Sequence, residues 1–449
     1  MIMKVIIVGG VAAGMSAAAK FRRLDKDSTI LIYEKSDIIS WGACGLPYYV
    51  GNFFENSDMM KARTIEDMKK VNIDVKINHE VIKVDPNKKT IQVKNWETGE
   101  IFEDNYDKLM ISTGAHSILP PIKNIDAKGV FTLKEFSDGL NLKKEMDKEE
   151  NQNIIIVGAG YIGLELLEAC VNLKKKNIKV IQLGDRVLAE SFDKEITDIM
   201  EEEIRSHEGV ELLLQEMVLE IIEKDGKVIG IKTDKNEYRA DLVVIATGVR
   251  PNTEFLKDSG INMLKNGALI IDKYGRTNIE DIYSGGDCAS VYHMISNEDV
   301  YIPLGTTANK IGRIIGENLA GLNSEFCGTL GSAAIKVLDL EAGRTGISEK
   351  EAIAKGLNYK TLFMKDKNHA GYYPGEEDIY IKLIYDVDTR LILGGQIIGK
   401  SGAVLRVDVI STALYSKLKV DDLRKIDFCY APPFSNAWDA LNVAGNLAK

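Results

Sequence analysis

The feature that most constrains this chain is a short pattern that occurs twice, about 150 residues apart. Each copy has an apolar β-forming run, a glycine-rich turn and then an apolar helical stretch. The two turns are Gly9-Gly10-Val11-Ala12-Ala13-Gly14 and Gly158-Ala159-Gly160-Tyr161-Ile162-Gly163. Such a turn brings backbone N–H groups and the positive end of a helix to a phosphate. Two copies therefore predict two dinucleotide-binding folds in one chain.

The second turn follows the GxGxxG spacing and comes directly after the apolar run Ile154–Val157. The next predicted strand, Lys179–Leu183, puts Gln182 at the position where an acidic residue would favour NADH. No arginine replaces it there, although Asp185 and Arg186 follow. The choice between NADH and NADPH stays open, with NADH favoured because no basic pair stands at the strand end.

The first turn departs from that spacing, since Val11 stands where the second glycine belongs. Gly9 and Gly14 remain, and the predicted strand Thr29–Tyr33 ends at Glu34, twenty residues beyond Gly14. A carboxylate at this position can bind both hydroxyls of an adenosine ribose, as FAD requires. We therefore assign FAD to the first unit and a nicotinamide nucleotide to the second.

At 449 residues the chain is longer than one hydrophobic core usually supports, so we expect two or three domains. Turn residues between β-forming runs predict hairpins at Asn78–Val93 and Val218–Lys232. From Gly328 onward the pattern changes to strands around Ala333–Leu338 and Ile379–Tyr385, followed by a helix at Ala403–Lys417. These last elements predict a separate C-terminal domain.

Charge and cysteine content exclude several classes of protein. The net charge of −10 argues against nucleic acid as the main partner. No segment approaches the roughly 18 apolar residues of a membrane span, and the first apolar run is too short for a signal peptide. The five cysteines are scattered without CxxC spacing, which favours reduced thiols over a disulfide framework or a zinc site. We expect a soluble cytoplasmic protein without a metal site.

Cys44 is the candidate reactive thiol. It lies in a turn of small residues, and Pro47 follows at a position typical of the first turn of a helix. A helix N-terminus lowers the pKa of a thiol, so we expect a nucleophilic thiolate; a buried structural cysteine is the alternative. No second cysteine lies within twelve residues. The chemistry then needs one cysteine that cycles through a mixed disulfide, a persulfide or a sulfenic acid.

Together these residues resemble the two-dinucleotide flavoprotein disulfide reductase family along nearly the whole chain. The run Ile282–Asp287 resembles the family's second FAD fingerprint, in which Asp287 would bind the ribitol. Thr247-Gly248 resembles the strand-end turn that links the two nucleotide domains. The resemblance implies an α/β fold with two Rossmann-like domains and a C-terminal α+β dimerisation domain. We divide the chain into an FAD domain (1–113 and 241–325), an NAD(P)H domain (114–240) and a dimerisation domain (326–449).

The resemblance also implies which residues contact the two cofactors. Tyr161 matches the tyrosine that covers the flavin until the nicotinamide arrives. The expected contacts to FAD and the nicotinamide nucleotide are Gly9, Gly10, Ala12, Ala13, Gly14, Glu34, Lys35, Val81, Thr113, Gly114, Asp287, Ala308, Gly158, Gly160, Tyr161, Ile162, Gly163, Gln182 and Gly248.

Within the family, the single-cysteine branch contains NADH oxidases, NADH peroxidases, coenzyme A-disulfide reductases, and persulfide or polysulfide reductases. Oxidases and peroxidases typically carry a histidine where this chain has Ala12. The runs His369–Gly375 and Tyr430–Ser435 resemble coenzyme A-disulfide reductases. In that subfamily a tyrosine from each run reaches the active site of the other subunit, and Tyr372 and Tyr430 match these positions. The resemblance thus implies a homodimer with shared active sites.

The same subfamily implies a binding site for coenzyme A. Cations near the end of the first helix suit a 3′-phosphate, although they also complement the helix dipole. Trp438 stands where at least some members carry a lysine. The matching positions are Ser16, Lys20, Arg23, Ser40, Ala43, Asn309 and Trp438.

The resemblance therefore implies an FAD-dependent NAD(P)H oxidoreductase that reduces coenzyme A disulfide through Cys44, with coenzyme A persulfides or polysulfide as further candidate acceptors. An NADH oxidase or peroxidase that cycles Cys44 through a sulfenic acid is the alternative, and a flavin redox sensor with little turnover is a remote one. We interpret Cys429, next to Tyr430, as core filler rather than a second redox thiol.

Overall fold

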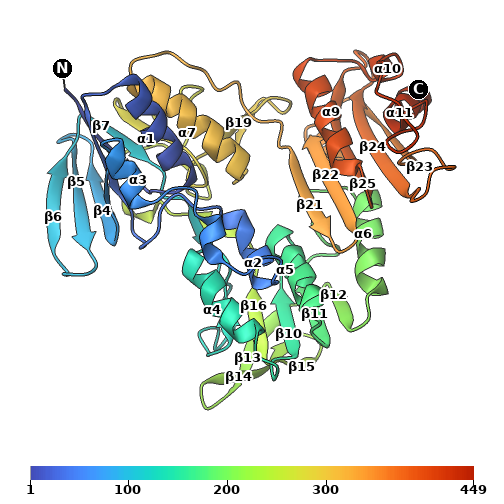
Figure 1. Ribbon diagram of the computed structural model, residues 1–449, viewed down its shortest axis with the longest axis horizontal. Helices are drawn as coiled ribbons and strands as arrows, with labels where there is room; N and C mark the ends of the chain where they lie inside the picture. Colours follow the sequence, from blue (N-terminus) through green and yellow to red (C-terminus); the bar gives the residue numbers. More distant parts are fainter. Residues whose placement is uncertain (1) are drawn as a thin grey trace.

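The computed structural model describes residues 2–449, and three five-stranded sheets organise them (Figure 1). The first sheet is parallel, with the order β18-β7-β1-β2-β3. Its strands are β1 (Lys4–Val8), β2 (Thr29–Tyr33), β3 (Asp74–Lys76), β7 (Lys108–Ile111) and β18 (Ile282–Ser284). Strand β1 is central and almost entirely buried, because helices cover one face of the sheet and β-strands the other.

Helices α1 (Ala12–Leu24) and α7 (Gly305–Leu319) lie side by side on the first sheet (Figure 1). Their backbones almost touch: a Cβ added at Gly312 would lie 2.4 Å from the Ala13 carbonyl oxygen. A Cβ at Gly316 would lie 2.5 Å from the Ala17 carbonyl oxygen. Only glycine at these positions of α7 permits this approach, which fixes the helix that follows the first glycine turn.

The second sheet is also parallel, with the order β12-β11-β10-β16-β9. Its elements are β9 (Val130–Phe131), α4 (Phe136–Met146), β10 (Asn153–Val157), α5 (Tyr161–Asn172), β11 (Asn177–Gln182), α6 (Lys194–Ser206), β12 (Val210–Leu214) and β16 (Leu242–Ile245). Strand β16 pairs with β10, although it follows residue 240. We therefore move the proposed boundary between the nucleotide and FAD domains to the end of β16.

Each parallel sheet carries an antiparallel sheet of three strands. The two predicted hairpins are confirmed, and each gains a third strand that the sequence did not indicate. These strands are β4 (His79–Asp85), β5 (Thr90–Asn95), β6 (Ile101–Asn105), β13 (Val218–Lys224), β14 (Lys227–Thr233) and β15 (Glu237–Arg239). The chain passes between the two parallel sheets at a short antiparallel pair, β8 (Ala115–Ser117) and β17 (Val249–Pro251).

The C-terminal sheet is antiparallel, with the order β21-β22-β25-β24-β23, and it lies apart from the first sheet in Figure 1. Its strands are β21 (Ala333–Val337), β22 (Leu340–Gly346), β23 (Tyr359–Lys367), β24 (Asp378–Asp386) and β25 (Ile392–Gly399). Helix α9 (Ala403–Tyr415) packs on β22 and β25, while α5 and α6 of the second sheet reach β21 and β25.

Short elements complete the chain. They are α2 (Leu46–Val50), α3 (Ile65–Lys70), β19 (Val291–His293), β20 (Glu298–Val300), α8 (Glu349–Ala354), α10 (Val420–Leu423) and α11 (Ala440–Leu447). Among residues 2–449, none of the helices combines the length and the apolar composition that crossing a membrane requires.

The contact between α1 and α7 gives a first prediction. Gly312→Ala should destabilise the protein by about 2 kcal/mol, because the added methyl group meets backbone atoms that cannot turn aside. It should also weaken FAD retention, since α1 begins at the first glycine turn. Thermal unfolding and bound-flavin absorbance measure both effects. Gly305→Ala on the same helix is the control: its Cβ meets nothing within 4 Å, so an equal loss would contradict this explanation.

Candidate functional site

The first glycine turn is held together by close backbone contacts. Gly9 has φ +98°, and a Cβ there would lie 2.2 Å from the Ser112 carbonyl oxygen. A Cβ at Gly14 would lie 2.0 Å from the Gly9 carbonyl oxygen. Helix α1 then starts after Val11 without a side-chain cap, so its first N–H groups are available to an anion. This turn fits the pyrophosphate of FAD.

The second turn repeats this geometry. Gly158 has φ +109°, and a Cβ there would lie 2.4 Å from the Ala246 carbonyl oxygen. A Cβ at Gly163 would lie 2.0 Å from the Gly158 carbonyl oxygen, whereas Gly160 faces open space. Helix α5 also lacks a side-chain cap. The open space and the uncapped helix fit a second pyrophosphate.

The strand-end residues bind the two turns in the same way. The Glu34 carboxylate accepts a hydrogen bond of 2.7 Å from the Gly10 N–H, and the Gln182 side-chain oxygen accepts one of 3.1 Å from the Ala159 N–H. Glu34 is buried and also accepts from the Ser36 N–H and hydroxyl, at 2.8 and 2.7 Å. Both residues therefore lie at their turns, as their predicted contacts to the ribose require.

A third glycine brings the two FAD motifs together. Gly286, with φ +87°, faces Ala13 and Ala308, whose Cβ atoms would lie 3.2 and 3.8 Å from a Cβ at this position. The neighbouring Asp287 carboxylate accepts a hydrogen bond of 2.9 Å from the Lys134 ammonium group. Lys134 lies just before α4, and no local pattern in the sequence indicated this contact. The Asp287 ribitol contact stays a prediction.

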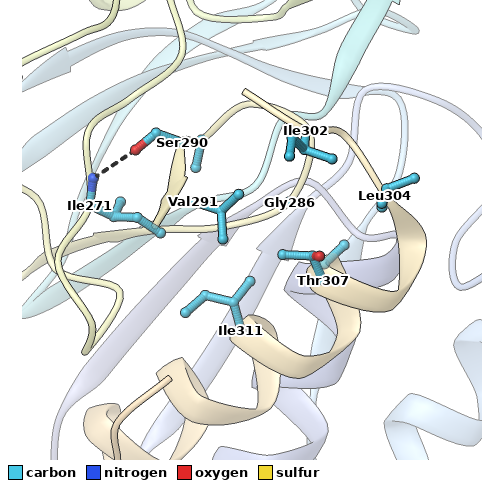
Figure 2. A pocket seen from close by; sticks show the side chains of 10 residues that line it. Ile271, Gly286, Ser290, Val291, Ile302, Leu304, Thr307 and Ile311 are labelled. Atoms are coloured by element: carbon cyan, nitrogen blue, oxygen red, sulfur yellow. Dashed lines mark hydrogen bonds between the residues drawn. The ribbon is translucent and has the colours of Figure 1, made fainter. Parts of the chain in front are cut away.

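A small cavity lies beside Gly286, between α7 and the segment that contains β19. Figure 2 shows Thr307 and Ile311 facing Val291 and Gly286 across it. Its volume of about 10 Å³ holds at most one water molecule.

The other predicted cofactor residues lie at varied depths. Val81 is buried in β4, whereas Lys35 is exposed and pairs with Glu80 at 2.8 Å. The Thr113 hydroxyl donates to the Asn252 carbonyl at 2.7 Å. Gly114 and Gly248 have positive φ angles, +68° and +110°. Ile162 packs against the apolar core. Ala12 lines a large cleft that is described below.

Cys44 lies in a 3₁₀ turn, Ala43–Gly45, directly before α2, and Pro47 occupies the first turn of that helix as predicted. Its side chain reaches solvent, yet the surrounding protein removes much of the water, and this desolvation raises the pKa of the thiol. Glu165 raises it further, while Lys134 lowers it. The prediction of a lowered pKa is wrong, because the five-residue α2 has only a small dipole and desolvation outweighs it.

Glu165 is a functional candidate that sequence reasoning missed. It lies on α5, one helical turn beyond Tyr161, and this spacing on a shared face was the available signal. Burial and the nearby Glu168 raise the pKa of Glu165 to about 7, and the Tyr48 hydroxyl beside it opposes the shift. Glu165 therefore exchanges its proton near neutral pH beside Cys44.

A cleft of about 660 Å³ opens in front of α1 and α7, and its wall includes Ser40–Gly42, two residues before Cys44. Four residues predicted to contact coenzyme A line it, namely Ser16, Arg23, Ser40 and Asn309. The Ser16 hydroxyl donates to the Asn309 side-chain oxygen at 2.8 Å. Sequence reasoning missed three further cations that line the cleft. Arg63 comes from a separate segment, whereas Lys310 and Arg313 lie on α7 beside the predicted residue Asn309.

Three predicted coenzyme A contacts lie outside this cleft. Lys20 forms an ion pair of 3.0 Å with Glu317 on α7, because its position on α1 directs it to the neighbouring helix. Ala43 packs against the apolar core. Trp438 is 59% exposed in the C-terminal domain, and within one chain it does not line the cleft.

The two predicted catalytic tyrosines form a hydrogen bond with each other. The Tyr372 and Tyr430 hydroxyls are 2.9 Å apart, and this hydrogen bond raises the pKa of Tyr372. Both side chains protrude from the C-terminal domain, with exposed fractions of 76% and 49%. The two motifs therefore form one phenol pair on an exposed surface.

Two protein-family models match most of this chain's sequence. The model for the pyridine nucleotide-disulphide oxidoreductases covers residues 3–312, and that for their dimerisation domain covers residues 332–441. The chain belongs to this family. As a pyridine nucleotide-disulphide oxidoreductase it is an enzyme that uses FAD and NAD(P)H, and its C-terminal domain is a dimerisation domain.

The names of similar proteins within the family state several different activities. The chain is 38% identical to an NAD(P)H coenzyme A polysulfide/persulfide reductase of Pyrococcus horikoshii, covering 99% of this chain and 98% of the relative. It is 32% identical to a coenzyme A disulfide reductase of Staphylococcus aureus, covering 99% and 100%. The structure of a water-forming NADH oxidase of Lactobacillus brevis, 32% identical, matches with a TM-score of 0.95 over 99% and 98% of the chains.

The charges around Cys44 give a second prediction. Glu165→Gln removes a charge that raises the pKa of Cys44, so its thiolate fraction should rise. Because Glu165 has a pKa of about 7, we expect alkylation of Cys44 roughly two- to fivefold faster near pH 8 and unchanged near pH 6. Mass spectrometry of the Cys44 peptide after iodoacetamide treatment of FAD-free protein measures this rate.

Lys134→Gln is the matched control, since this ammonium group lowers the pKa of Cys44. Its loss should slow the alkylation. Equal rates in both variants and the unsubstituted protein would contradict the electrostatic account.

Proposed function

We propose that this flavoenzyme uses NAD(P)H to reduce coenzyme A disulfide through Cys44, with coenzyme A persulfides or polysulfide as further acceptors. One observation carries the proposal: a cleft lined by four cations and no carboxylate leads to the turn that holds Cys44. Its volume of about 660 Å³ lies within the usual range for a small-molecule site.

The lining residues suit a nucleotide thiol. Arg23, Arg63, Lys310 and Arg313 can bind the 3′-phosphate and the pyrophosphate of coenzyme A. The thiol end of such a molecule would extend along Ser40–Gly42 toward Cys44. The names of the Pyrococcus and Staphylococcus relatives, both of which mention coenzyme A, support the same substrate class.

The proposed reaction consumes one NAD(P)H and one proton and converts one coenzyme A disulfide into two coenzyme A thiols. FAD held by the first glycine turn and Glu34 would supply the electron chemistry, which is hydride acceptance from the nicotinamide and two-electron reduction of a disulfide. The second glycine turn holds the nicotinamide nucleotide, with Tyr161 at the start of α5. The Cys44 thiolate attacks the substrate disulfide, so a Cys44–coenzyme A bond forms and a coenzyme A thiolate leaves.

The leaving thiolate needs a hydrogen-bond donor, and we assign this role to Tyr372 and Tyr430 of the second subunit. Their phenols are paired and exposed on the dimerisation domain, where a second subunit can receive them. In the same proposal, Glu165 holds and releases a proton beside Cys44. The five cysteines are all free, which supports a cytoplasmic location.

An NADH oxidase is the second candidate, supported by the likeness to the Lactobacillus enzyme. Ala12 disfavours it, because a methyl group on the cleft wall cannot act as an acid or base toward peroxide.

Steady-state oxidation of NADH and NADPH separates the two candidates and sets the nucleotide preference. Coenzyme A disulfide, polysulfide, peroxide and oxygen alone are each tested as the acceptor. We expect turnover to require coenzyme A disulfide or polysulfide, and Cys44→Ser to abolish it. Rapid turnover with oxygen alone would establish the oxidase instead.

Substitution of the cleft cations tests the substrate. Arg63→Gln and Lys310→Gln should each raise the KM for coenzyme A disulfide about tenfold, because each removes a charge-assisted contact to a phosphate. The kcat should change little. Lys88→Gln, which removes an exposed cation on another surface, should leave both constants unchanged. A KM that rises equally in all three variants would contradict the proposal that coenzyme A disulfide binds in this cleft.

A further inference from the structure

Three long polar side chains form a row across the buried face of the C-terminal sheet. Arg344 on β22 pairs in register with Gln396 on β25, which pairs in turn with Lys382 on β24. They are only 8%, 1% and 1% exposed. We name these three residues the polar row.

The polar row contacts a segment of the nucleotide-binding region. The Arg344 guanidinium donates to the Ser191 carbonyl oxygen at 2.8 Å. The Gln396 amide binds Asp193 twice: its NH₂ group donates to the carboxylate at 2.7 Å, and its oxygen accepts from the Asp193 N–H at 2.8 Å. Neighbouring strands of the sheet thus bind alternate residues of the segment that leads into α6.

Lys382 completes the row at the start of α6. Its ammonium group donates to the Glu195 carboxylate at 2.7 Å and to that of Glu349 at 2.6 Å, and it lies 3.6 Å from Asp193. A buried cation is costly unless carboxylates surround it, and here three of them do. Two of the three belong to the nucleotide-binding region.

The same segment, residues 183–193, reaches the second glycine turn at its other end. The Leu188 N–H donates to the Ala159 carbonyl oxygen at 3.0 Å. The Ser191 side chain lies beside the hydroxyl of Tyr161, the first residue of α5. The segment therefore joins the C-terminal sheet to the turn and the tyrosine of the nucleotide site.

Packing within the C-terminal sheet does not require the polar row. The strands around it are apolar, and an apolar row of similar volume would avoid the desolvation of an arginine, a lysine and an amide. Hydrogen bonds instead join the polar row to Ser191 and Asp193, at the end of segment 183–193, and to Glu195 in the first turn of α6. The contacts thus specify where that segment lies.

We propose that the polar row positions residues 183–193 for binding of the nicotinamide nucleotide, so that affinity for NAD(P)H depends on the C-terminal domain. Arg344, Gln396 and Lys382 are then positioning residues that do not touch the nucleotide. The inference rests on the second glycine turn being the nucleotide site, which is part of the proposed function.

The test uses the FAD-loaded dimer with Gln396→Met or Arg344→Lys, since loss of Lys382 would leave three carboxylates, among them the buried Asp193, without their shared cation. Calorimetry with NAD⁺ and NADP⁺ should give dissociation constants about tenfold higher in both variants. The KM for NAD(P)H should rise similarly, with kcat at saturation retained. Reoxidation of dithionite-reduced protein by coenzyme A disulfide uses no nucleotide and should be unchanged.

Arg390→Gln is the matched control. It removes an ion pair of 2.9 Å to Asp421 within the C-terminal domain, so it should lower the Tm without changing nucleotide affinity. Unchanged dissociation constants in the two row variants, or an equal rise in the control, would overturn the inference. Failure of the reduced unsubstituted protein to react with coenzyme A disulfide would refute the proposed acceptor alone, because the nucleotide titrations do not involve it.

Discussion

The structure depends on two places where a strand and the following helix approach so closely that no side chain fits. A Cβ at Gly14 or Gly163 would lie 2.0 Å from the carbonyl oxygen of Gly9 or Gly158. This contact fixes the direction of α1 and α5 and leaves their first N–H groups facing outward. It also brings the strand-end residues within hydrogen-bond distance of the turns. Both predicted cofactor sites follow from this one constraint.

Around Cys44, the candidate reactive thiol, the charges oppose one another. Desolvation and Glu165 favour the neutral thiol of Cys44, while Lys134 favours the thiolate and is itself bound to Asp287. A thiol held between such groups changes its ionisation when one of them gains or loses a proton or a partner. The pKa of Glu165 near 7 places that change in the neutral range. The ionisation of Cys44 is therefore coupled to α5, which carries Glu165 and, at its start, Tyr161.

Strand periodicity and turn residues predicted the parallel sheets and both hairpins, because these signals are local in the sequence. The family resemblance added Arg23 and Asn309, which do share a cleft. Lys20 lies outside that cleft, because a helical residue can face either the cleft or the next helix and only packing decides; its contact to coenzyme A stays a prediction. Arg63 comes from another segment, and the partners of Gln396 depend on strand register. Such contacts join distant segments, so no local pattern indicates them.

The proposed reaction requires that Cys44 forms a mixed disulfide with coenzyme A. Mass spectrometry of the oxidised protein after treatment with coenzyme A disulfide tests it most directly. We expect one coenzyme A attached per subunit, located on the Cys44 peptide and released by NAD(P)H. Absence of the adduct, together with a sulfenic acid on Cys44 formed during turnover with oxygen, would contradict it.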